Sequence, residues 1–405
     1  MAKKILIISG IVGSGWLSGK PHGSQSFPQT IMGYSKRGWN VFLMVGFQAR
    51  KKKKYFIEPS VNVFQFTNNK IRRFLLNANP HFFFRNIWWV YFQILSFFKG
   101  FFIARKVKPD VFYGYEIHAI PVAKLLSFIF KRPVIFRYQG TKVPSYKKQK
   151  FWKLRYFPHV LAMRLKANLY IMANDGTTGK TILEEMGIDS SKIRFWVNGV
   201  DKNMFDLSLN EDNTRDRLGF KKDDKIIISV SRLEKWKGID KTINSLPAII
   251  KKIPKIIYLI IGWGSEKENL EKIVKNLKLE NHVRFIGMVQ HDKLKDYYNI
   301  CDIFVSMYDI SNVGNPLFEA MAQGKCIVAL DVGDTDKFIE DDKNGILIKK
   351  EKIKELSEKI IDLINNDEKR KMLSENVRKF AKKTLWDWDS RMDAEVKEVE
   401  KLIKN

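Results

Sequence analysis

The sequence contains little cysteine, few acidic residues in its first half and no long apolar run near its start. Only Cys301 and Cys326 are present, each in an apolar stretch. This scarcity excludes a disulfide-rich scaffold and predicts two buried thiols in a reducing, cytosolic compartment. The first apolar run, Ile5 to Ile8, ends at Ser9-Gly10. It is too short for an export signal and predicts a strand instead.

Acidic residues are scarce only in the first half. Residues 1–205 contain 34 Lys and Arg but 8 Asp and Glu, a net charge of +26, whereas the 38 basic and 36 acidic residues after them leave +2. This asymmetry predicts a polyanionic partner for the first half, either nucleic acid or an anionic membrane.

An aromatic segment at residues 81–106 favours the membrane. Its longest uncharged run, Asn86 to Phe98, has 13 residues, fewer than the ~20 that a spanning helix needs. Trp and Phe flanked by Arg and Lys are typical of a helix that lies in the bilayer interface, although an aromatic core helix is the alternative. Basic clusters at Lys51–Lys54 and at residues 147–155 would add reversible attraction to anionic lipid.

The remaining pattern predicts an α/β fold. With 405 residues, 45% of them hydrophobic, the chain is too long for one ordinary core. Apolar strand-like runs alternate with helical stretches in two series, as in parallel sheets covered on both faces. We expect a basic N-terminal domain at 1–205, a second domain at 206–380, and a helical tail at 381–405 that packs back on the first.

Three segments of the second series carry candidate binding residues. Arg232 and Lys237 lie five residues apart in a loop after a predicted strand, where they can clamp a diphosphate. Two cations in an exposed loop are the plainer alternative. Gly262 and Gly264 end the next strand and either let backbone approach a ligand or only turn the chain.

The third segment runs from Ser311 to Glu319. It is a small, turn-rich loop followed by a carboxylate at the start of a helix. A helix N-terminus binds anions, and one acid there can accept hydrogen bonds from hydroxyls. The segment therefore predicts a nucleotide-sugar site.

These segments occur in a recognisable order, namely Asn198–Asp201 (N-G-V-D), Ser231–Gly238 (S-R-L-E-K-W-K-G), Ile261–Gly264 (I-G-W-G), Val283–Val289 (V-R-F-I-G-M-V) and Asn312–Ala329 (N-V-G-N-P-L-F-E-A-M-A-Q-G-K-C-I-V-A). Their order and spacing resemble those of the retaining glycosyltransferases of family 4, and the resemblance covers nearly the whole chain. It implies the GT-B fold, in which two Rossmann-like doubly wound domains face a central cleft.

The resemblance also implies roles for single residues. Arg232 and Lys237 would bind the donor diphosphate and stabilise the leaving group, and Glu319 would accept hydrogen bonds from the ribose. Met288 and Val289 would lie beside the base. Backbone N–H groups near the sugar and phosphate would come from the turn at Gly314, Asn315, Pro316 (which itself has none) and Leu317.

The chain departs from the family pattern at the donor sugar. Ser311 stands where the family often has a first Glu, eight residues before the second. Either Asp309 replaces this acid from a shifted loop, or Ser311 and Asn312 hydrogen-bond the sugar as neutral groups. We prefer the second, because a two-residue shift moves a carboxylate by several Å.

The first domain carries two further candidates. A loop with Gly15, Gly19 and Gly23 would face the diphosphate and help to form the acceptor site, unless it is only a flexible surface loop. Glu116 and His118 follow a predicted strand where the family commonly has a His that touches the donor sugar. Either of them fits that place.

No metal or other cofactor is expected. The D-x-D triplets at Asp334–Asp336 and Asp387–Asp389 fall in a loop without a metal-ligand counterpart and in the helical tail. We therefore predict a hexosyltransferase-type enzyme that moves a sugar from a nucleoside-diphosphate donor to a lipid-linked or glycan acceptor. It would be peripheral at the cytoplasmic face of the cell membrane and would bind no nucleic acid. A nucleotide-sugar epimerase of the same fold and a nucleic-acid-binding protein are the alternatives.

Overall fold

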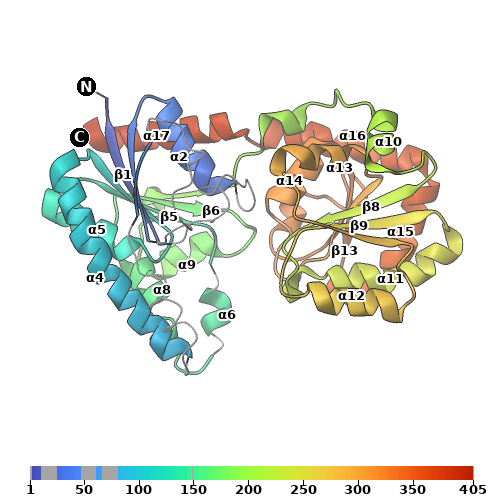
Figure 1. Cartoon of the computed structure of the whole chain (residues 1–405), viewed down its shortest axis with the longest axis horizontal. Helices are drawn as coiled ribbons and strands as arrows, with labels where there is room; N and C mark the ends of the chain where they lie inside the picture. The colour runs from blue at the N-terminus through green and yellow to red at the C-terminus, as the bar shows by residue number, and fades with distance from the viewer. Residues whose placement is uncertain are drawn as a thin grey trace. The chain divides into compact units, whose positions relative to one another are not determined.

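The computed structural model describes residues 2–10, 25–46, 61–65, 81–141, 143–147 and 149–404. The chain divides into two compact units (Figure 1). Unit 1 comprises Met1–Asn174, Thr178–Val197 and Trp388–Asn405, and unit 2 comprises Asp175–Thr177 and Asn198–Asp387.

Unit 1 is built on a parallel sheet. Its strand order is β3-β2-β1-β4-β5-β6-β7, so the order reverses between β1 and β4. The strands are β1 (Lys4–Ser9), β2 (Asn40–Val45), β3 (Val61–Gln65), β4 (Val111–Tyr115), β5 (Val134–Tyr138), β6 (Leu169–Ala173) and β7 (Ile193–Trp196).

Helices cover both faces of this sheet, which explains the uninterrupted apolar run in β1. Leu6 and Ile8 pack on one side with residues of α4 and α5, whereas Ile5 and Ile7 pack on the other with residues of α2 and α17. Alternate side chains of a strand point to opposite faces, so a strand buried on both sides must be apolar throughout. The helices are α2 (Ser26–Lys36), α4 (His81–Val107), α5 (Ile120–Phe130), α6 (Val143–Lys147), α7 (Trp152–Arg155), α8 (Phe157–Arg164), α9 (Gly179–Glu185) and α17 (Trp388–Lys404).

Unit 2 repeats this plan. Its parallel sheet has the order β10-β9-β8-β11-β12-β13, which reverses between β8 and β11. The strands are β8 (Lys225–Val230), β9 (Ile256–Ile261), β10 (Val283–Gly287), β11 (Ile303–Ser306), β12 (Cys326–Leu330) and β13 (Ile346–Ile348). The helices are α10 (Glu211–Leu218), α11 (Ile239–Lys252), α12 (Lys267–Asn276), α13 (Leu294–Asn299), α14 (Asn315–Ala322), α15 (Leu356–Asn365) and α16 (Asp367–Thr384). Each unit is therefore a Rossmann-like doubly wound domain, which confirms the predicted fold class.

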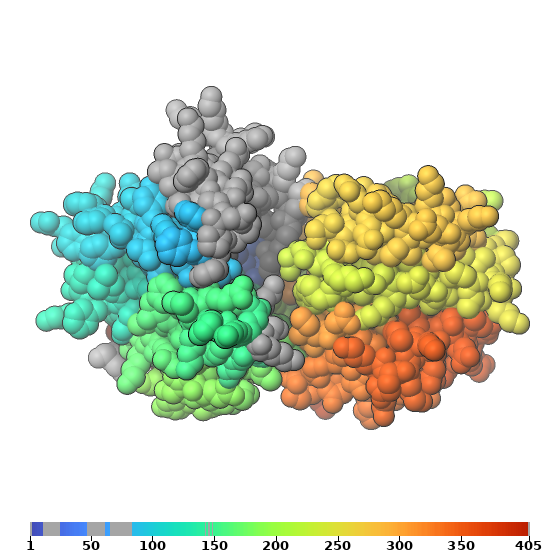
Figure 2. Space-filling view, turned by 90° about the horizontal axis from the view of Figure 1, so that it is seen from below, coloured from blue at the N-terminus to red at the C-terminus, as the bar shows by residue number. Residues whose placement is uncertain are grey.

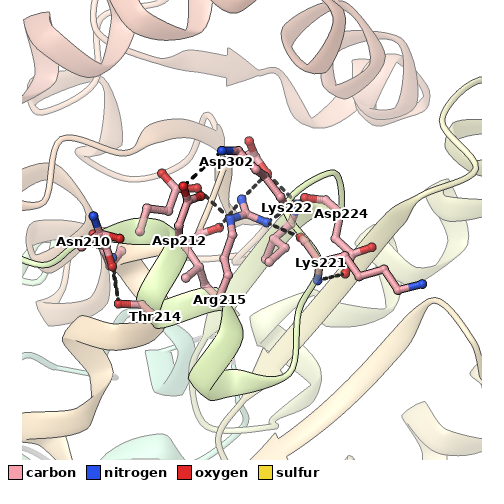
Figure 3. Close-up of polar contacts among 12 residues, drawn as sticks. Asn210, Asp212, Thr214, Arg215, Lys221, Lys222, Asp224 and Asp302 are labelled. Carbon is pink, nitrogen blue, oxygen red and sulfur yellow. Dashed lines mark hydrogen bonds and ion pairs between the residues drawn. The ribbon is translucent and has the colours of Figure 1, made fainter.

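Arg215 connects α10 to the segments that precede β8 and β11 (Figure 3). Its guanidinium is buried and donates to Glu211 Oε1 at 2.8 Å, to the Asp224 carbonyl at 2.9 Å and to the Ile300 carbonyl at 3.2 Å. Asn210 caps the helix by accepting from a backbone N–H of its first turn. These contacts satisfy a buried cation with oxygen acceptors, and we assign this cluster to the structure of unit 2 rather than to ligand binding.

The division of the chain differs from the expected boundaries. The main segment of unit 2 begins at Asn198, ahead of the expected boundary between residues 205 and 206. The segment that belongs to unit 1 at the end of the chain begins at Trp388. The polar residues Glu211–Leu218 form α10, which belongs to unit 2.

A buried ion network holds α17 in unit 1. Glu395 is fully buried, and its Oε2 lies 2.7 Å from Arg137 Nη1 and 3.0 Å from Arg391 Nη1. Its Oε1 accepts hydrogen bonds from the hydroxyls of Tyr113 at 2.8 Å and Tyr34 at 3.3 Å. We call these five residues the Glu395 network. The guanidinium of Arg137, which lies in β5, is therefore committed to this network.

Cys301 and Cys326 are both buried and free. Burial raises the pKa of Cys326 to about 12, so the thiol stays protonated at neutral pH. The prediction of two buried thiols is confirmed.

Candidate functional site

The loops that carry the predicted donor residues meet at the point where the sheet order of unit 2 reverses. One loop follows β8 and contains Arg232 and Lys237, and the other follows β11 and leads to α14. The two are joined directly, because the Asp309 N–H donates to the Trp236 carbonyl at 2.8 Å. Ligands of open α/β sheets bind at this position, outside the carboxyl ends of the strands.

Gly262 and Gly264 position the first of these loops. Gly262 has φ of 139°, and a Cβ there would overlap the Ser231 carbonyl. A Cβ at Gly264 would overlap the Leu233 carbonyl in the same way. The glycines are therefore needed for backbone-to-backbone packing that sets the place of Arg232, in addition to any approach of backbone to a ligand.

Lys237 lies between two aromatic rings. Its Nζ is 3.9 Å from the ring centroid of Trp236 and 3.4 Å from that of Tyr308. Burial, with the nearby Arg232 cation, lowers the pKa of Lys237 to about 7. The ammonium is thus held in one place by cation–π contact but is poorly solvated, and an incoming phosphate would stabilise its charge.

Arg232 is the exposed cation of the pair. Its side chain is 68% exposed, and its Nη1 lies 3.4 Å from Glu234 Oε1. A guanidinium paired so weakly at a surface retains its donors for a stronger anion.

The loop after β11 contains Asn312, which we expected to hydrogen-bond the donor sugar in place of the family's first Glu. The structure gives its amide other partners. Asn312 is buried, its Oδ1 accepts from Ser306 Oγ at 2.7 Å and from the Tyr308 N–H at 3.1 Å, and its Nδ2 donates to the Leu330 carbonyl at 2.6 Å. The Asn312 amide therefore holds the loop together. This bonding argues against the preferred idea that Asn312 contacts the sugar.

Ser311 and Asp309 also have partners in this loop. Ser311 is buried, and its Oγ accepts from the Val313 N–H at 3.1 Å. Asp309 forms an ion pair with Lys241, whose Nζ also donates to the Met307 carbonyl at 3.0 Å. A carboxylate paired with a lysine is a poor substitute for a free acid, which argues against Asp309. The contact of Ser311 with the sugar stays a prediction.

The N-terminus of α14 carries backbone groups that no side chain caps. Gly314 precedes the helix without a side-chain cap, and Pro316 contributes no N–H. The N–H groups of Asn315 and Leu317 belong to the first turn, which has no intrahelical acceptors. Such N–H groups and the helix dipole favour an anion at a helix N-terminus. Binding of a phosphate there stays a prediction.

Glu319 has partners that the sequence did not indicate. It is 4% exposed, and its Oε1 lies 2.9 Å from His291 Nε2 while its Oε2 accepts from the Tyr298 hydroxyl at 3.0 Å. The other ring nitrogen of His291 lies 2.8 Å from Asp201 Oδ2. The available signal was a lone histidine in the loop after β10, which we had not considered.

Met288 and Val289 follow β10, which is an edge strand of the unit 2 sheet and pairs with β9. The Gly262 N–H donates to the Gly287 carbonyl at 2.8 Å, so the loop after β9 is anchored next to them. Met288 is 58% exposed. Their place beside a base stays a prediction.

Unit 1 has an equivalent reversal between β1 and β4, and Glu116 and His118 follow β4 there. Glu116 has φ of 68°, a strained value for a residue with a Cβ. Burial raises its pKa to about 7, against the opposing charge of Arg137. A carboxyl that titrates near neutral pH is suited to proton transfer.

His118 is packed among apolar groups. Its ring meets Trp88 edge-on at 6.1 Å, and a Cβ at Gly10 would come within 2.5 Å of the His118 Cβ. Among the described residues, its buried Nδ1 has no hydrogen-bond partner. Burial and then Arg85 lower its pKa to about 4, so the imidazole is neutral at pH 7. The loop with Gly15, Gly19 and Gly23 lies outside the described residues.

In the part of the chain that the structure describes, no three His, Cys, Asp or Glu side chains are grouped so that they could hold a metal ion. Asp334 lies 3.0 Å from Lys337, and Asp389 belongs to the first turn of α17. Independence from metal stays a prediction.

Comparisons with known proteins agree with this architecture. The family model described as "Glycosyl transferases group 1" matches residues 210–380. The Methanocaldococcus jannaschii protein named "Uncharacterized glycosyltransferase MJ1069" is 30% identical over 291 residues, which cover 69% of this chain and 72% of that protein. The alpha-monoglucosyldiacylglycerol synthase of Acholeplasma laidlawii is 30% identical over 162 residues, 40% of each chain.

Among solved structures, Anabaena Alr3699/HepE in complex with UDP superposes with a TM-score of 0.74 at 21% sequence identity, and the match covers 98% of this chain and 99% of that one. The identity is low, so this match speaks for the fold. Together with the relatives and the site geometry, it leads to one conclusion: the chain belongs to the group 1 glycosyltransferases and is a glycosyltransferase of the GT-B fold.

Proposed function

We propose that this glycosyltransferase is a retaining enzyme of family 4. It transfers a sugar from a nucleoside-diphosphate sugar to a lipid-linked saccharide or glycan acceptor at the cytoplasmic face of the membrane. The observation that carries the proposal is the meeting of Arg232, Lys237 and the uncapped N-terminus of α14 at the reversal point of unit 2. The UDP bound by the Anabaena neighbour supports a nucleotide-sugar donor.

The chemistry follows from charge. When the bond between the anomeric carbon and the diphosphate breaks, negative charge develops on the leaving oxygen. Arg232, Lys237 and the α14 N-terminus provide positive charge for that oxygen before the reaction starts, so no reorganisation is needed. The acceptor then attacks from the face that the diphosphate leaves, as the family resemblance implies.

The donor proposal is tested with two variants in the same loop. Arg232→Ala and Lys237→Ala should each lower kcat by about a hundredfold, the effect typical of losing one preorganised donor. Lys235→Ala is the matched control, because Lys235 lies in the same loop but is exposed and paired with Asp240 at 2.9 Å. Release of nucleoside diphosphate from UDP- and GDP-sugars is the readout. If no donor binds, or if the control loses as much activity, the proposal fails.

An exposed apolar stripe on α4 supports a membrane-bound acceptor. Its residues recur every three or four positions, so they share one helix face, and each is 40% exposed or more; they are Phe83, Ile87, Val90, Ile94, Phe98 and Phe102. The opposite face of α4 is buried through Trp88, Trp89 and Phe92. We call the exposed face the α4 stripe.

Neighbouring elements extend this surface. Exposed Leu125, Phe128 and Ile129 lie on α5, which packs against α4, and exposed Phe151 and Leu154 lie at α7. Arg85 of α4 donates to a backbone carbonyl of α7 at 2.8 Å, which keeps these elements together. Figure 2 shows α4 in blue to cyan beside the green segment of α6 to α8 on one face of unit 1.

Charge and burial favour a helix that lies along the bilayer. Residues 117–174 contain no Asp or Glu, and α4 itself carries only cations. By length and composition alone, Phe83–Val107 could cross a membrane, but 39% of its most apolar window is buried inside the protein. A helix packed on one side and apolar on the other suits the interface rather than a span. The Acholeplasma relative is named a monoglucosyldiacylglycerol synthase, and this name agrees with a lipid acceptor.

Vesicle sedimentation tests this part. The protein should bind phosphatidylglycerol vesicles more tightly than phosphatidylcholine vesicles. A Phe98→Ser/Phe102→Ser variant should bind at least tenfold more weakly, because each phenyl ring contributes about 1.5–3 kcal/mol on leaving water. Met372→Ser, which removes an exposed apolar side chain from α16 in unit 2, is the control. Equal binding by the double variant would refute the membrane assignment.

A further inference from the structure

His291 stands between two acids. It lies in a short helical turn, His291–Lys293, that follows β10. Its Nδ1 is 2.8 Å from Asp201 Oδ2 and its Nε2 is 2.9 Å from Glu319 Oε1. An imidazole can donate from both nitrogens only when it is protonated.

The surroundings keep this proton in place. Burial alone would lower the pKa of His291, but the hydrogen bonds to Asp201 and Glu319 raise it to about 10. At neutral pH the ring is therefore an imidazolium that is shared by two carboxylates. Its side chain is 12% exposed and that of Glu319 is 5% exposed, so the pair is poorly screened by solvent.

Glu319 is thereby fixed at both oxygens. Oε1 faces His291, and Oε2 accepts from the hydroxyl of Tyr298, which lies on α13. A carboxylate offers about four acceptor positions, so two donors leave capacity for further hydroxyls. The existing contacts fix the direction in which that remaining capacity points.

Asp201 connects the same cation to a third segment. It belongs to the N-G-V-D stretch with which the chain enters unit 2, and Val200 in that stretch pairs with Trp386 through a backbone hydrogen bond of 2.9 Å. His291 thus joins three segments that are far apart in sequence, namely residues 198–201, the turn after β10, and α14.

We propose that His291 is the positioning residue for ribose recognition: held by Asp201, it orients the Glu319 carboxylate so that its free acceptor positions receive the ribose hydroxyls. This inference rests on the proposed function, since it assumes that a nucleotide occupies the site beside α14. Without His291, Oε1 of the buried Glu319 loses the donor that fixes it, so the carboxylate turns away and loses its acceptor geometry.

The test compares nucleotides with and without the hydroxyls. Binding of UDP, GDP and ADP to the full-length protein is measured by calorimetry, and the nucleotide that binds is then compared with its 2′,3′-dideoxy form. The wild type should prefer the ribonucleotide by at least tenfold. His291→Ala should reduce that preference to threefold or less while leaving the affinity for the dideoxy form unchanged.

A matched histidine provides the control. His282 lies in the same unit and makes a hydrogen bond to the Ile256 carbonyl at 2.9 Å rather than to an acid. His282→Gln should keep the wild-type preference for ribose. Should His291→Ala fail to fold, Asp201→Asn serves as the second variant and should also weaken the preference, because it removes the charge that holds the imidazolium.

The outcomes separate the inference from the function beneath it. If the wild type binds no nucleotide, both fall. If the wild type discriminates but His291→Ala discriminates equally well, only the role of His291 is overturned. Equal losses of ribo- and dideoxynucleotide affinity would mean that His291 merely supports the fold, which also overturns the inference.

Discussion

Replacing Glu395 should destabilise the packing of α17 in unit 1. Arg137 and Arg391 are each 1% exposed, and both rely on the Glu395 carboxylate, which is fully buried. Glu395→Gln keeps the shape but leaves two buried cations without a counter-charge. Removing one partner of a buried ion pair costs about 3–5 kcal/mol. The hydroxyls of Tyr34 and Tyr113 also lose their charged acceptor, so the upper part of this range is expected.

Hydrogen exchange followed by mass spectrometry measures this loss where it occurs. The chain has two units, so a single global unfolding curve would mix two transitions. In Glu395→Gln, amides of α17 and β5 that exchange through opening of unit 1 should exchange about a hundredfold faster or more, since each 1.4 kcal/mol is a factor of ten. Amides of unit 2 should keep their wild-type rates.

Glu400→Gln is the control on the same helix. Glu400 pairs with Lys3 at 2.5 Å, but both side chains are more than one third exposed. Exposed pairs contribute about 0–1 kcal/mol, so exchange should change by no more than a few-fold. If Glu395→Gln behaves like Glu400→Gln, the ion network does not stabilise the helix and our reasoning is wrong.

The same network predicts a direction for acid sensitivity. Burial raises the pKa of Glu395, but Arg137 and Arg391 outweigh it and hold this pKa below the usual 4.5. A group whose pKa is lower in the folded state stabilises the fold fully above its unfolded pKa, and this stabilisation is lost as the pH falls through the folded pKa. The difference in stability between wild type and Glu395→Gln should therefore be constant above about pH 5 and shrink only at more acidic pH.

Three further outcomes are expected. Burial and Arg232 lower the pKa of Lys237 to about 7, so donor affinity measured by calorimetry should be constant below about pH 7 and weaken above it. Lys237→Arg should flatten this pH profile, because arginine stays charged. An unchanged profile in that variant would contradict the role of the lysine. Asn312→Ala should destabilise unit 2 by about 1–3 kcal/mol, measured from the hydrogen exchange of unit 2 amides, since it leaves buried groups unpaired. Asp309→Asn should have a smaller effect. Sugar transfer should survive an excess of EDTA, and its loss would refute independence from metal.

The apolar pattern of the chain was sufficient for the architecture. Runs such as Ile5–Ile8 are apolar at every position because both faces of each sheet are covered, and this requirement is visible without coordinates. The spacing of the glycine and cation motifs also placed Arg232 and Lys237 after β8, since a loop that follows a parallel strand always lies at the carboxyl edge.

The sequence pattern could not predict which side chains become partners. Arg137 pairs with Glu395, which is 258 residues away in the sequence, and Glu319 pairs with His291, which is 28 residues away. The Asn312 amide had appeared free to bind a sugar, yet the fold surrounds it with Ser306, the Tyr308 backbone and Leu330.

The sequence by itself therefore determined the two doubly wound units, the edge of the sheet at which each candidate lies, and membership of the group 1 glycosyltransferases. Periodicity and short spacings are local properties, and they are enough for these features. Only the tertiary structure decided which polar groups already have partners and which remain available, as with the committed Arg137 and Asn312 and the exposed Arg232. Hydrogen-bond partners are chosen by proximity in space, and proximity in space depends on the packing of the whole chain.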